Sequence, residues 1–213
     1  MVLPRGPSSS IHPRTVDDAQ GPFAGPESSA VAGWASLIGG LLLGWPFIRG
    51  IAGELPIVTF LLKPGVAPLA SASLALGPLV LAFGLVGWWR LLGHSVVGRA
   101  STVVLGIGLV LMFLDEASFL APEVVGFPAS SVVYFALIGI GSLLLPIALR
   151  RLPGLPRDGL VLIGLGGPAA AVLLGAPWPL GLGAIVPAIG LLYALGWIRV
   201  GIAVLRVRRR DSA

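Results

Sequence analysis

The sequence contains no cysteine and no asparagine, and charged side chains are rare. Without cysteine, disulfides, thiolate nucleophiles and cysteine-ligated metal or Fe–S centres are excluded. Without asparagine there is no N-glycosylation site. Only 11% of the 213 residues are charged, against about a quarter in a soluble domain. Because 56% are hydrophobic, lipid must cover much of the surface of the folded chain.

The longest charge-free stretch lies between Asp158 and Arg199 and contains forty residues. A helix needs roughly 20 apolar residues to cross a bilayer, so this stretch is long enough for two crossings. The Gly-Ala-Pro-Trp-Pro sequence at 175–179 breaks it near its middle. We therefore predict two membrane-spanning helices joined by a tight turn, which makes the chain a multi-pass membrane protein.

The apolar segments predict an all-α polytopic bundle with six transmembrane helices. We place the helices at about 30–49, 67–89, 100–120, 129–149, 159–175 and 179–204. Three regions follow from this assignment: a disordered N-terminal tail at 1–28, the six-helix transmembrane domain at 29–205, and a basic C-terminal tail at 206–213. The apolar run within 50–66 is too short to span, so we expect it to be interfacial or re-entrant.

The arginines indicate the orientation of the bundle. Nine of the thirteen occupy the link after the second segment, the link after the fourth and the C-terminal tail, and the positive-inside rule places these regions, with both termini, in the cytoplasm. One lysine against thirteen arginines favours a GC-rich genome and hence a prokaryotic plasma membrane. We assign the net charge of +5 to anionic lipid headgroups and expect no nucleic-acid partner. The predicted topology and headgroup anchors are Trp88, Trp89, Arg90, Arg150, Arg151, Trp197, Arg199, Arg206, Arg208, Arg209 and Arg210.

Two short patterns concern helix packing. The sequences Gly-Trp-Trp-Arg at 87–90 and Gly-Trp-Ile-Arg at 196–199 suggest repeated hairpins, although any inward-running helix can end in an interfacial Trp and Arg. Small residues recur every fourth position, and such stripes let helix backbones approach closely. The pattern leaves open whether the packing partner belongs to the same chain. The residues of these stripes are Gly40, Gly44, Gly167, Ala171 and Gly175.

Asp115 and Glu116 are the candidate ion or substrate residues, because they lie in the later part of the third segment. An ionisable group at the centre of a span costs roughly 2.5–3.5 kcal/mol on insertion scales, so such groups tend to be functional. One interpretation is a carboxylate coupled to a proton or cation. The other is that both acids lie solvated at the outer boundary. A bundle cavity lined by Pro78 or Pro187 and reached by either acid would favour transport.

The sequence offers few residues for metal binding, haem ligation or catalysis. The two histidines are His12 in the tail and His94 in a predicted link, so we expect no metal site and no haem. The membrane serines have no histidine within a span to act as a base. We therefore expect no cofactor and no catalytic residues. An enzyme would need one polar cleft formed by Arg90, His94, Arg150 and Arg157.

Two functions remain after this reasoning. The first is an accessory or structural subunit that binds membrane lipids and possibly other membrane subunits or a second copy of itself. Its support is the short links, the glycine stripes and the lack of a catalytic set. The second is a small transporter or channel for a proton, cation or small solute that uses Asp115 and Glu116.

Overall fold

The computed structural model describes residues 26–51, 68–93, 95–120, 131–152, 154–175 and 185–211, which form an all-helical bundle. Each predicted segment corresponds to one helix, and the boundaries differ by a few residues. The predicted tail up to residue 25, the link at 52–67 and His94 lie outside the described residues. The helices are α1 (Pro26–Ile51), α3 (Pro68–Leu91), α4 (Val96–Leu120), α5 (Ser131–Leu149), α6 (Arg157–Gly175) and α7 (Ile185–Asp211).

The helix boundaries follow from local chemistry. Pro26 and Pro68 open α1 and α3, where the missing proline N–H has no intrahelical partner to lose. Gly93 and Gly154 have positive φ angles of 54° and 83°, which glycine adopts without strain, and they reverse the chain after α3 and α5. The last helix differs from expectation. It begins later than residue 179 and continues to Asp211, so most of the predicted basic tail extends α7.

Five of the six helices are long and apolar enough to cross a membrane, which confirms the prediction of a multi-pass helical bundle. The backbone polar groups of such segments are satisfied within each helix, as hydrocarbon requires. α6 is the remaining helix; it begins with Arg157 and Asp158, and its charge-free part is 159–175. The five stretches are Glu27–Arg49, Ala72–Leu91, Val96–Ser118, Val132–Leu149 and Ile185–Val207.

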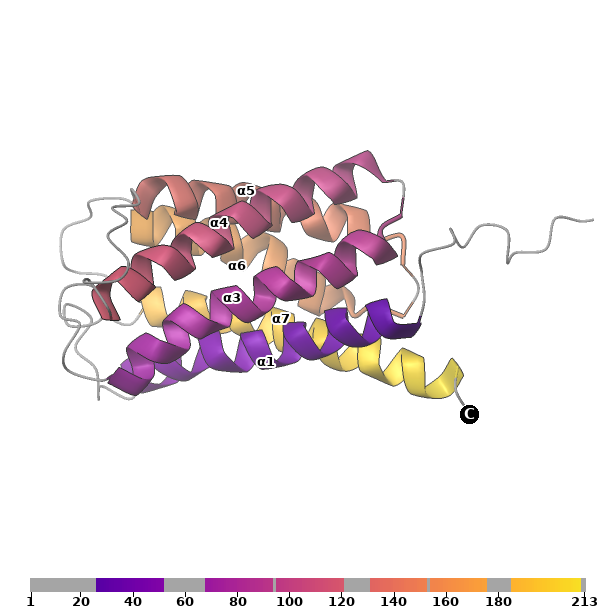
Figure 1. Ribbon diagram of the computed structural model, residues 1–213, viewed down its shortest axis with the longest axis horizontal. Helices are drawn as coiled ribbons and strands as arrows, with labels where there is room; N and C mark the ends of the chain where they lie inside the picture. Colours follow the sequence, from indigo (N-terminus) through magenta and orange to yellow (C-terminus); the bar gives the residue numbers. More distant parts are fainter. Residues whose placement is uncertain are drawn as a thin grey trace, which may run out of the picture.

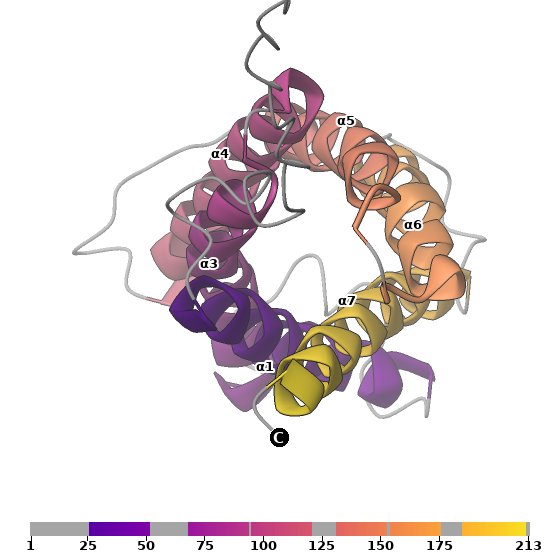
Figure 2. The same ribbon diagram turned by 90° about the vertical axis from the view of Figure 1, so that its right-hand side faces the viewer.

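The helices form a closed ring, as the end-on view in Figure 2 shows. Each helix packs against its neighbours in the chain, and α1 packs against α7 to close the circle. The short links from α3 to α4 and from α5 to α6 lie at the end of the bundle where the C-terminus lies (Figure 1). We call this the basic end, because it holds Arg90, Arg99, Arg150, Arg151, Arg157, Arg199 and Arg206.

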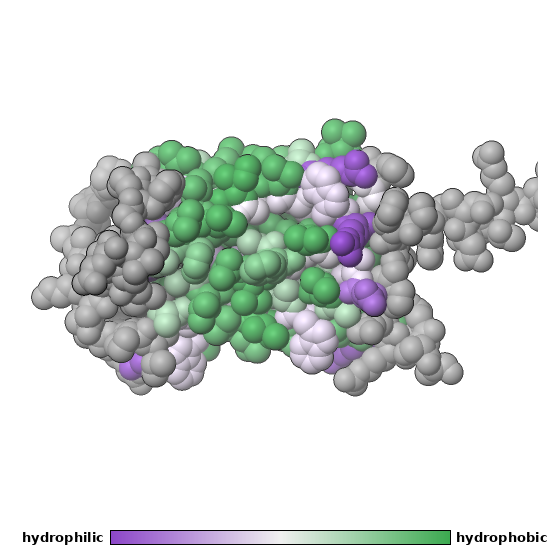
Figure 3. Space-filling model, viewed as in Figure 1, coloured by the Kyte–Doolittle hydropathy of each residue, from purple (hydrophilic) through white to green (hydrophobic). Residues whose placement is uncertain are grey.

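The ring has an apolar exterior and an apolar interior. Large hydrophobic side chains cover the outside, and Figure 3 shows them along the middle of one face, with hydrophilic side chains gathered mainly toward the basic end. Inside, one cluster of buried side chains draws on all six helices. Trp88 and Trp197 belong to it and are fully buried, so they pack in the core rather than at the lipid surface, where the sequence placed them. Trp89 is 37% exposed and does reach the outer surface.

The small-residue stripes are used within the chain. A Cβ added to Gly40 would lie 2.9 Å from the carbonyl oxygen of Ala194 in α7. Ala171 of α6 approaches Gly139 of α5, whose added Cβ would lie 3.1 Å from the Ala171 Cβ. Gly167 of α6 lies against α5 as well. The partner helices that the sequence left open are therefore α7 for the first stripe and α5 for the second.

The two Gly-Trp sequences occupy matching places in their hairpins. A Cβ at Gly87 would lie 2.7 Å from the backbone nitrogen of Ala32 in α1, and one at Gly196 would lie 2.9 Å from that of Ile163 in α6. Each glycine thus brings its helix close to the first helix of the same hairpin. The tryptophan that follows is buried in both cases. This correspondence favours the interpretation of repeated hairpins.

Tight glycine contacts are unevenly distributed around the ring. At five of the six helix pairs, an added Cβ would come within 3.1 Å of the neighbouring helix. The exception among the described residues is the α3–α4 pair, where Gly106 has only the Leu85 Cδ1 atom nearby, at 3.5 Å. These two helices are therefore less closely apposed at their glycine than the other pairs.

We predict that, of two alanine substitutions on one face of α1, one destabilises the bundle and the other leaves its stability almost unchanged. Gly40→Ala places a methyl group against the backbone of α7, and such overpacking costs about 1–3 kcal/mol. Gly44→Ala is the matched control, because its Cβ would lie 3.4 Å from the Ala194 Cβ, an ordinary contact. Its free energy of unfolding should change by no more than about 0.5 kcal/mol. Unfolding in mild detergent measures both, and equal losses would contradict the packing described for α1 and α7.

Candidate functional site

Asp115 lies on the side of α4 that faces α5. It follows Gly108 by seven residues, two helical turns, and a Cβ on Gly108 would meet the backbone nitrogen of Ile138 in α5 at 2.9 Å. The hydroxyl of Tyr134, near the start of α5, donates a hydrogen bond to Asp115 Oδ2 at 3.0 Å. Asp115 is therefore held by a neighbouring helix. A hydrogen bond to the carboxylate offsets part of the desolvation that half-burial imposes.

Glu116 lies on a different face of the same helix. It follows Met112 by four residues and Leu109 by seven, and both of these side chains are buried in the core cluster. Residues at this spacing share one helix face, so Glu116 continues the core-facing stripe toward the end opposite the basic end. Its side chain is half-buried. Among the described residues, none forms a hydrogen bond or ion pair with its carboxylate.

Asp115 and Glu116 are each half-exposed, so their burial agrees in part with both interpretations. Pro78 and Pro187 are both buried in helix packing. One pocket lies outside the ring between α3 and α4, and another lies beside the link into α6; neither is lined by an acid of this pair or by either proline.

Buried hydrogen bonds also join helices inside the ring. Trp88 Nε1 donates to Ser36 Oγ at 3.0 Å and connects α3 with α1. The hydroxyls of Ser142 and Tyr193 lie 2.9 Å apart and connect α5 with α7. The buried Trp197 indole lies edge-on to the Tyr193 ring, with centroids 6.2 Å apart. Its N–H has no hydrogen-bond partner among the described residues.

Sequence reasoning missed Tyr134, Tyr193 and Ser36. A usable signal was present for the tyrosines, which are the only two in the chain and both lie in apolar segments. A buried tyrosine hydroxyl usually finds a hydrogen-bond partner, so each one predicts a polar contact between helices. The partner residues Asp115 and Ser142 depend on how helices are arranged around the ring. No sequence spacing gives that arrangement.

The basic end carries several exposed arginines, and one ion pair involves them among the described residues. Arg199 and Asp158 form an ion pair of 2.6 Å, but both side chains are half-exposed, so the pair stabilises the fold little. Arg206 is exposed on the last turns of α7, and the side chains of residues 208–210 are outside the described part. The pocket at this end includes Arg199 and Arg206. It does not include the arginines that an enzyme cleft would require, which are Arg90, Arg150 and Arg157.

We predict a measurable coupling between Asp115 and Tyr134. A double-mutant cycle with Asp115→Asn and Tyr134→Phe should give an interaction free energy of about 0.5–2 kcal/mol, because the hydroxyl donates to this carboxyl group. The control cycle pairs Tyr134→Phe with Glu116→Gln and should give less than about 0.5 kcal/mol. Unfolding in detergent provides all the values. Equal couplings would contradict the assignment of Asp115 to the α4–α5 contact.

Comparisons with protein-family models, curated proteins and solved structures found no match to this chain. No functional residue can therefore be transferred from a relative. The acids of α4, the hydrogen bonds inside the ring and the basic end are the observations from which function is argued.

Proposed function

We propose that this protein is a non-enzymatic accessory or structural membrane protein, which binds lipids and partner membrane proteins through its outer surface and basic end. The observation that carries the proposal is the filled ring. One apolar cluster contributed by all six helices occupies the interior, and most described charged side chains lie at the ends of the bundle. A packed apolar interior favours a scaffold over an aqueous path.

The proposal includes the orientation of the bundle. We propose that all six helices cross the membrane, with the basic end and both termini in the cytoplasm of a prokaryotic cell. The closed ring supports α6 as a span, because this helix lies between α5 and α7 and packs against both. The positive-inside rule supports the orientation, because the exposed arginines of both short links lie at one end.

The arginines give the proposed contact with lipid a chemical basis. Basic side chains near an anionic membrane surface each contribute about 1 kcal/mol to its attraction. Arg90, Arg150 and Arg151 are exposed at the basic end, and Arg206 is exposed on the helix that leaves it. Tryptophan at this level also favours the interface, and Trp89 fits that role because it reaches the outer surface.

Transport of a proton or cation is the second candidate, and one observation favours it. Glu116 extends the core-facing stripe of α4 and has no partner among the described residues. A carboxylate in this place could exchange a proton or bind a cation that enters from the end opposite the basic end. Asp115 is less suited to that role, because Tyr134 already donates to it.

Purification from the native membrane distinguishes the two candidates. We expect native mass spectrometry in mild detergent to show a stoichiometric second membrane protein or a retained lipid. We also expect liposomes containing the protein alone to show no proton or cation flux. A bare monomer or homo-oligomer with flux that Glu116→Gln abolishes would contradict the accessory function. Asp158→Asn is the control acid, because it lies at the basic end.

The orientation has its own test, which the absence of cysteine makes direct. In right-side-out vesicles, a membrane-impermeant maleimide should label Ser130→Cys and Ala176→Cys. It should label Ser95→Cys only after permeabilisation, because Ser95 lies in the link between α3 and α4. Protection of Ala176→Cys would show that α6 does not cross. Labelling of Ser95→Cys alone would reverse the orientation.

A further inference from the structure

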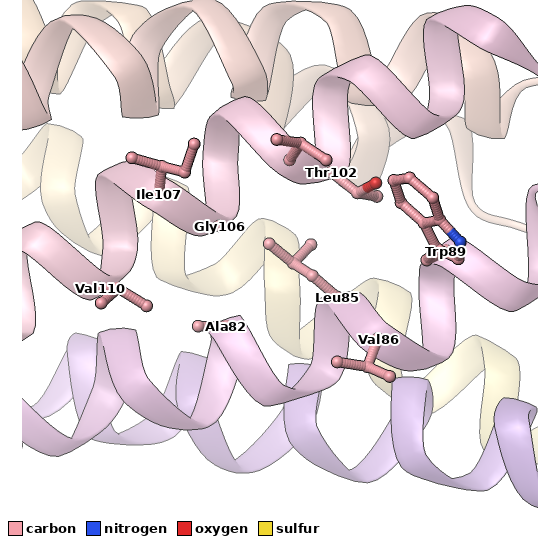
Figure 4. A pocket seen from close by; sticks show the side chains of 9 residues that line it. Ala82, Leu85, Val86, Trp89, Thr102, Gly106, Ile107 and Val110 are labelled. Carbon is pink, nitrogen blue, oxygen red and sulfur yellow. The ribbon is translucent and has the colours of Figure 1, made fainter.

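A groove runs along the outside of the ring between α3 and α4 (Figure 4). Its volume is about 560 Å³, and nearly all of its lining atoms are apolar. The floor contains the buried Leu85 and the small residue Gly106, and Val86 and Ile107 form exposed walls that are 53% and 49% accessible. The groove therefore opens to the surroundings of the bundle and not to its interior.

The groove exists because α3 and α4 lack the close glycine contact found at the other helix pairs. A Cβ on Gly106 would meet only Leu85 Cδ1, at 3.5 Å. Ala82 on the facing helix is also small, so the two backbones leave space between them that no side chain of the described residues fills. Bulky valine and isoleucine side chains stand on either side of this space. The result is a narrow apolar channel on a lipid-facing surface.

The groove has the length of one leaflet. It extends along α4 from Thr102 to Val110, and these eight residue-to-residue steps of 1.5 Å cover about 12 Å. The hydrocarbon core is roughly 30 Å thick, so one leaflet is about 15 Å. The Thr102 and Trp89 end of the groove lies toward the basic end (Figure 4). An acyl chain entering there would lie within a single leaflet.

Cations stand at this mouth of the groove. The Arg99 guanidinium carbon lies 5.3 Å from the centroid of the Trp89 ring, which itself lines the groove. Arg99 Nε donates to the carbonyl oxygen of Gly93 at 2.8 Å, which fixes the side chain. Its terminal nitrogens have no acceptor among the described residues. Arg90 is exposed and follows the wall residue Val86 by four positions, so the two residues share one face of α3. The Arg99 guanidinium therefore lies at the end of an apolar channel, and Arg90 lies one helical turn beyond one of its walls.

We propose that this groove binds one anionic glycerophospholipid, with an acyl chain along Leu85 and Gly106 and the phosphate at Arg99 and Arg90. The proposal rests on the proposed function and gives its lipid-binding part a specific site. Arginine recognises phosphate oxygens through its planar fork of donors. A partner helix is a poorer occupant, because it would pack along both leaflets and prefer small residues on the walls. The groove ends near mid-membrane, and its walls are bulky.

The test is retention of phospholipid by the full chain in native mass spectrometry. Phosphatidylglycerol and phosphatidylcholine with the same acyl chains are added in competition. We expect one retained phosphatidylglycerol per chain. Gly106→Leu should remove it, because the new side chain adds bulk to the groove floor, and its Cβ would meet only Leu85 Cδ1, at 3.5 Å. The control Ala136→Leu adds bulk to the exposed face of α5 and should leave retention unchanged.

The headgroup contact is tested in the same experiment. Arg99→Gln should weaken the preference for phosphatidylglycerol about fivefold, the effect of about 1 kcal/mol. The control Arg151→Gln removes an exposed arginine of the other link and should have no effect on the retained lipid. Equal preference in both variants, or equal retention of the two lipids by the unmodified chain, would overturn the proposal.

A second measurement needs no variant in the groove floor. A phospholipid brominated along its acyl chain, added at one equivalent, should quench the fluorescence of Trp89, and the quenched component should disappear in Trp89→Phe. If the unmodified protein and Trp89→Phe show the same quenching, the proposal is overturned, and this holds even if Gly106→Leu fails to fold.

If a stoichiometric membrane protein co-purifies with the chain while lipid retention is equal in all variants, the groove proposal fails and the proposed function stands. If Gly106→Leu releases that protein instead, the groove holds a helix and the lipid proposal is overturned.

Discussion

Close approach of helix backbones at glycine is the constraint on which the ring depends. Lipid tails are as apolar as leucine, so helices in a bilayer associate through packing rather than through a hydrophobic drive. A Cβ on Gly141 would lie 2.6 Å from the backbone nitrogen of Leu105, and one on Gly201 would lie 2.7 Å from the carbonyl oxygen of Gly33. Such contacts occur at five of the six helix pairs and draw them into a circle. The α3–α4 pair lacks one, and the outer groove lies there.

Large aromatic side chains and a few polar contacts determine how the helices pack inside the ring. Trp88 and Trp197 are the largest fully buried side chains and occupy the space that a six-helix circle encloses. Each buried polar side chain carries a desolvation penalty unless it finds a partner. Ser36 supplies a partner between the neighbouring helices α1 and α3, and Tyr193 supplies one between α7 and α5, which favours this arrangement of the helices. The Trp197 N–H lacks such a partner in the described part of the chain and is a polar group inside an apolar core.

The two ends of the bundle differ in chemistry. One end gathers exposed arginines, and the other has the half-buried carboxylates of α4. Charge at a membrane surface needs no internal partner, because water and headgroups solvate it. A carboxylate within the bundle does need one, and Asp115 has Tyr134 while Glu116 has none among the described residues. This difference assigns the proposed lipid contacts to one end and any ion chemistry to the other.

The sequence by itself determined the class of the protein, the six helices and the grouping of arginines. These follow from long charge-free runs and from residues adjacent in the chain, so local pattern is sufficient. The separation of Asp115 from Glu116 onto two helix faces was also readable from their spacing. Their partners, the burial of Trp88 and Trp197, and the α3–α4 groove were decided only by the tertiary structure. Each depends on which helices are neighbours and how closely they approach, and that is set by contacts between residues far apart in the chain.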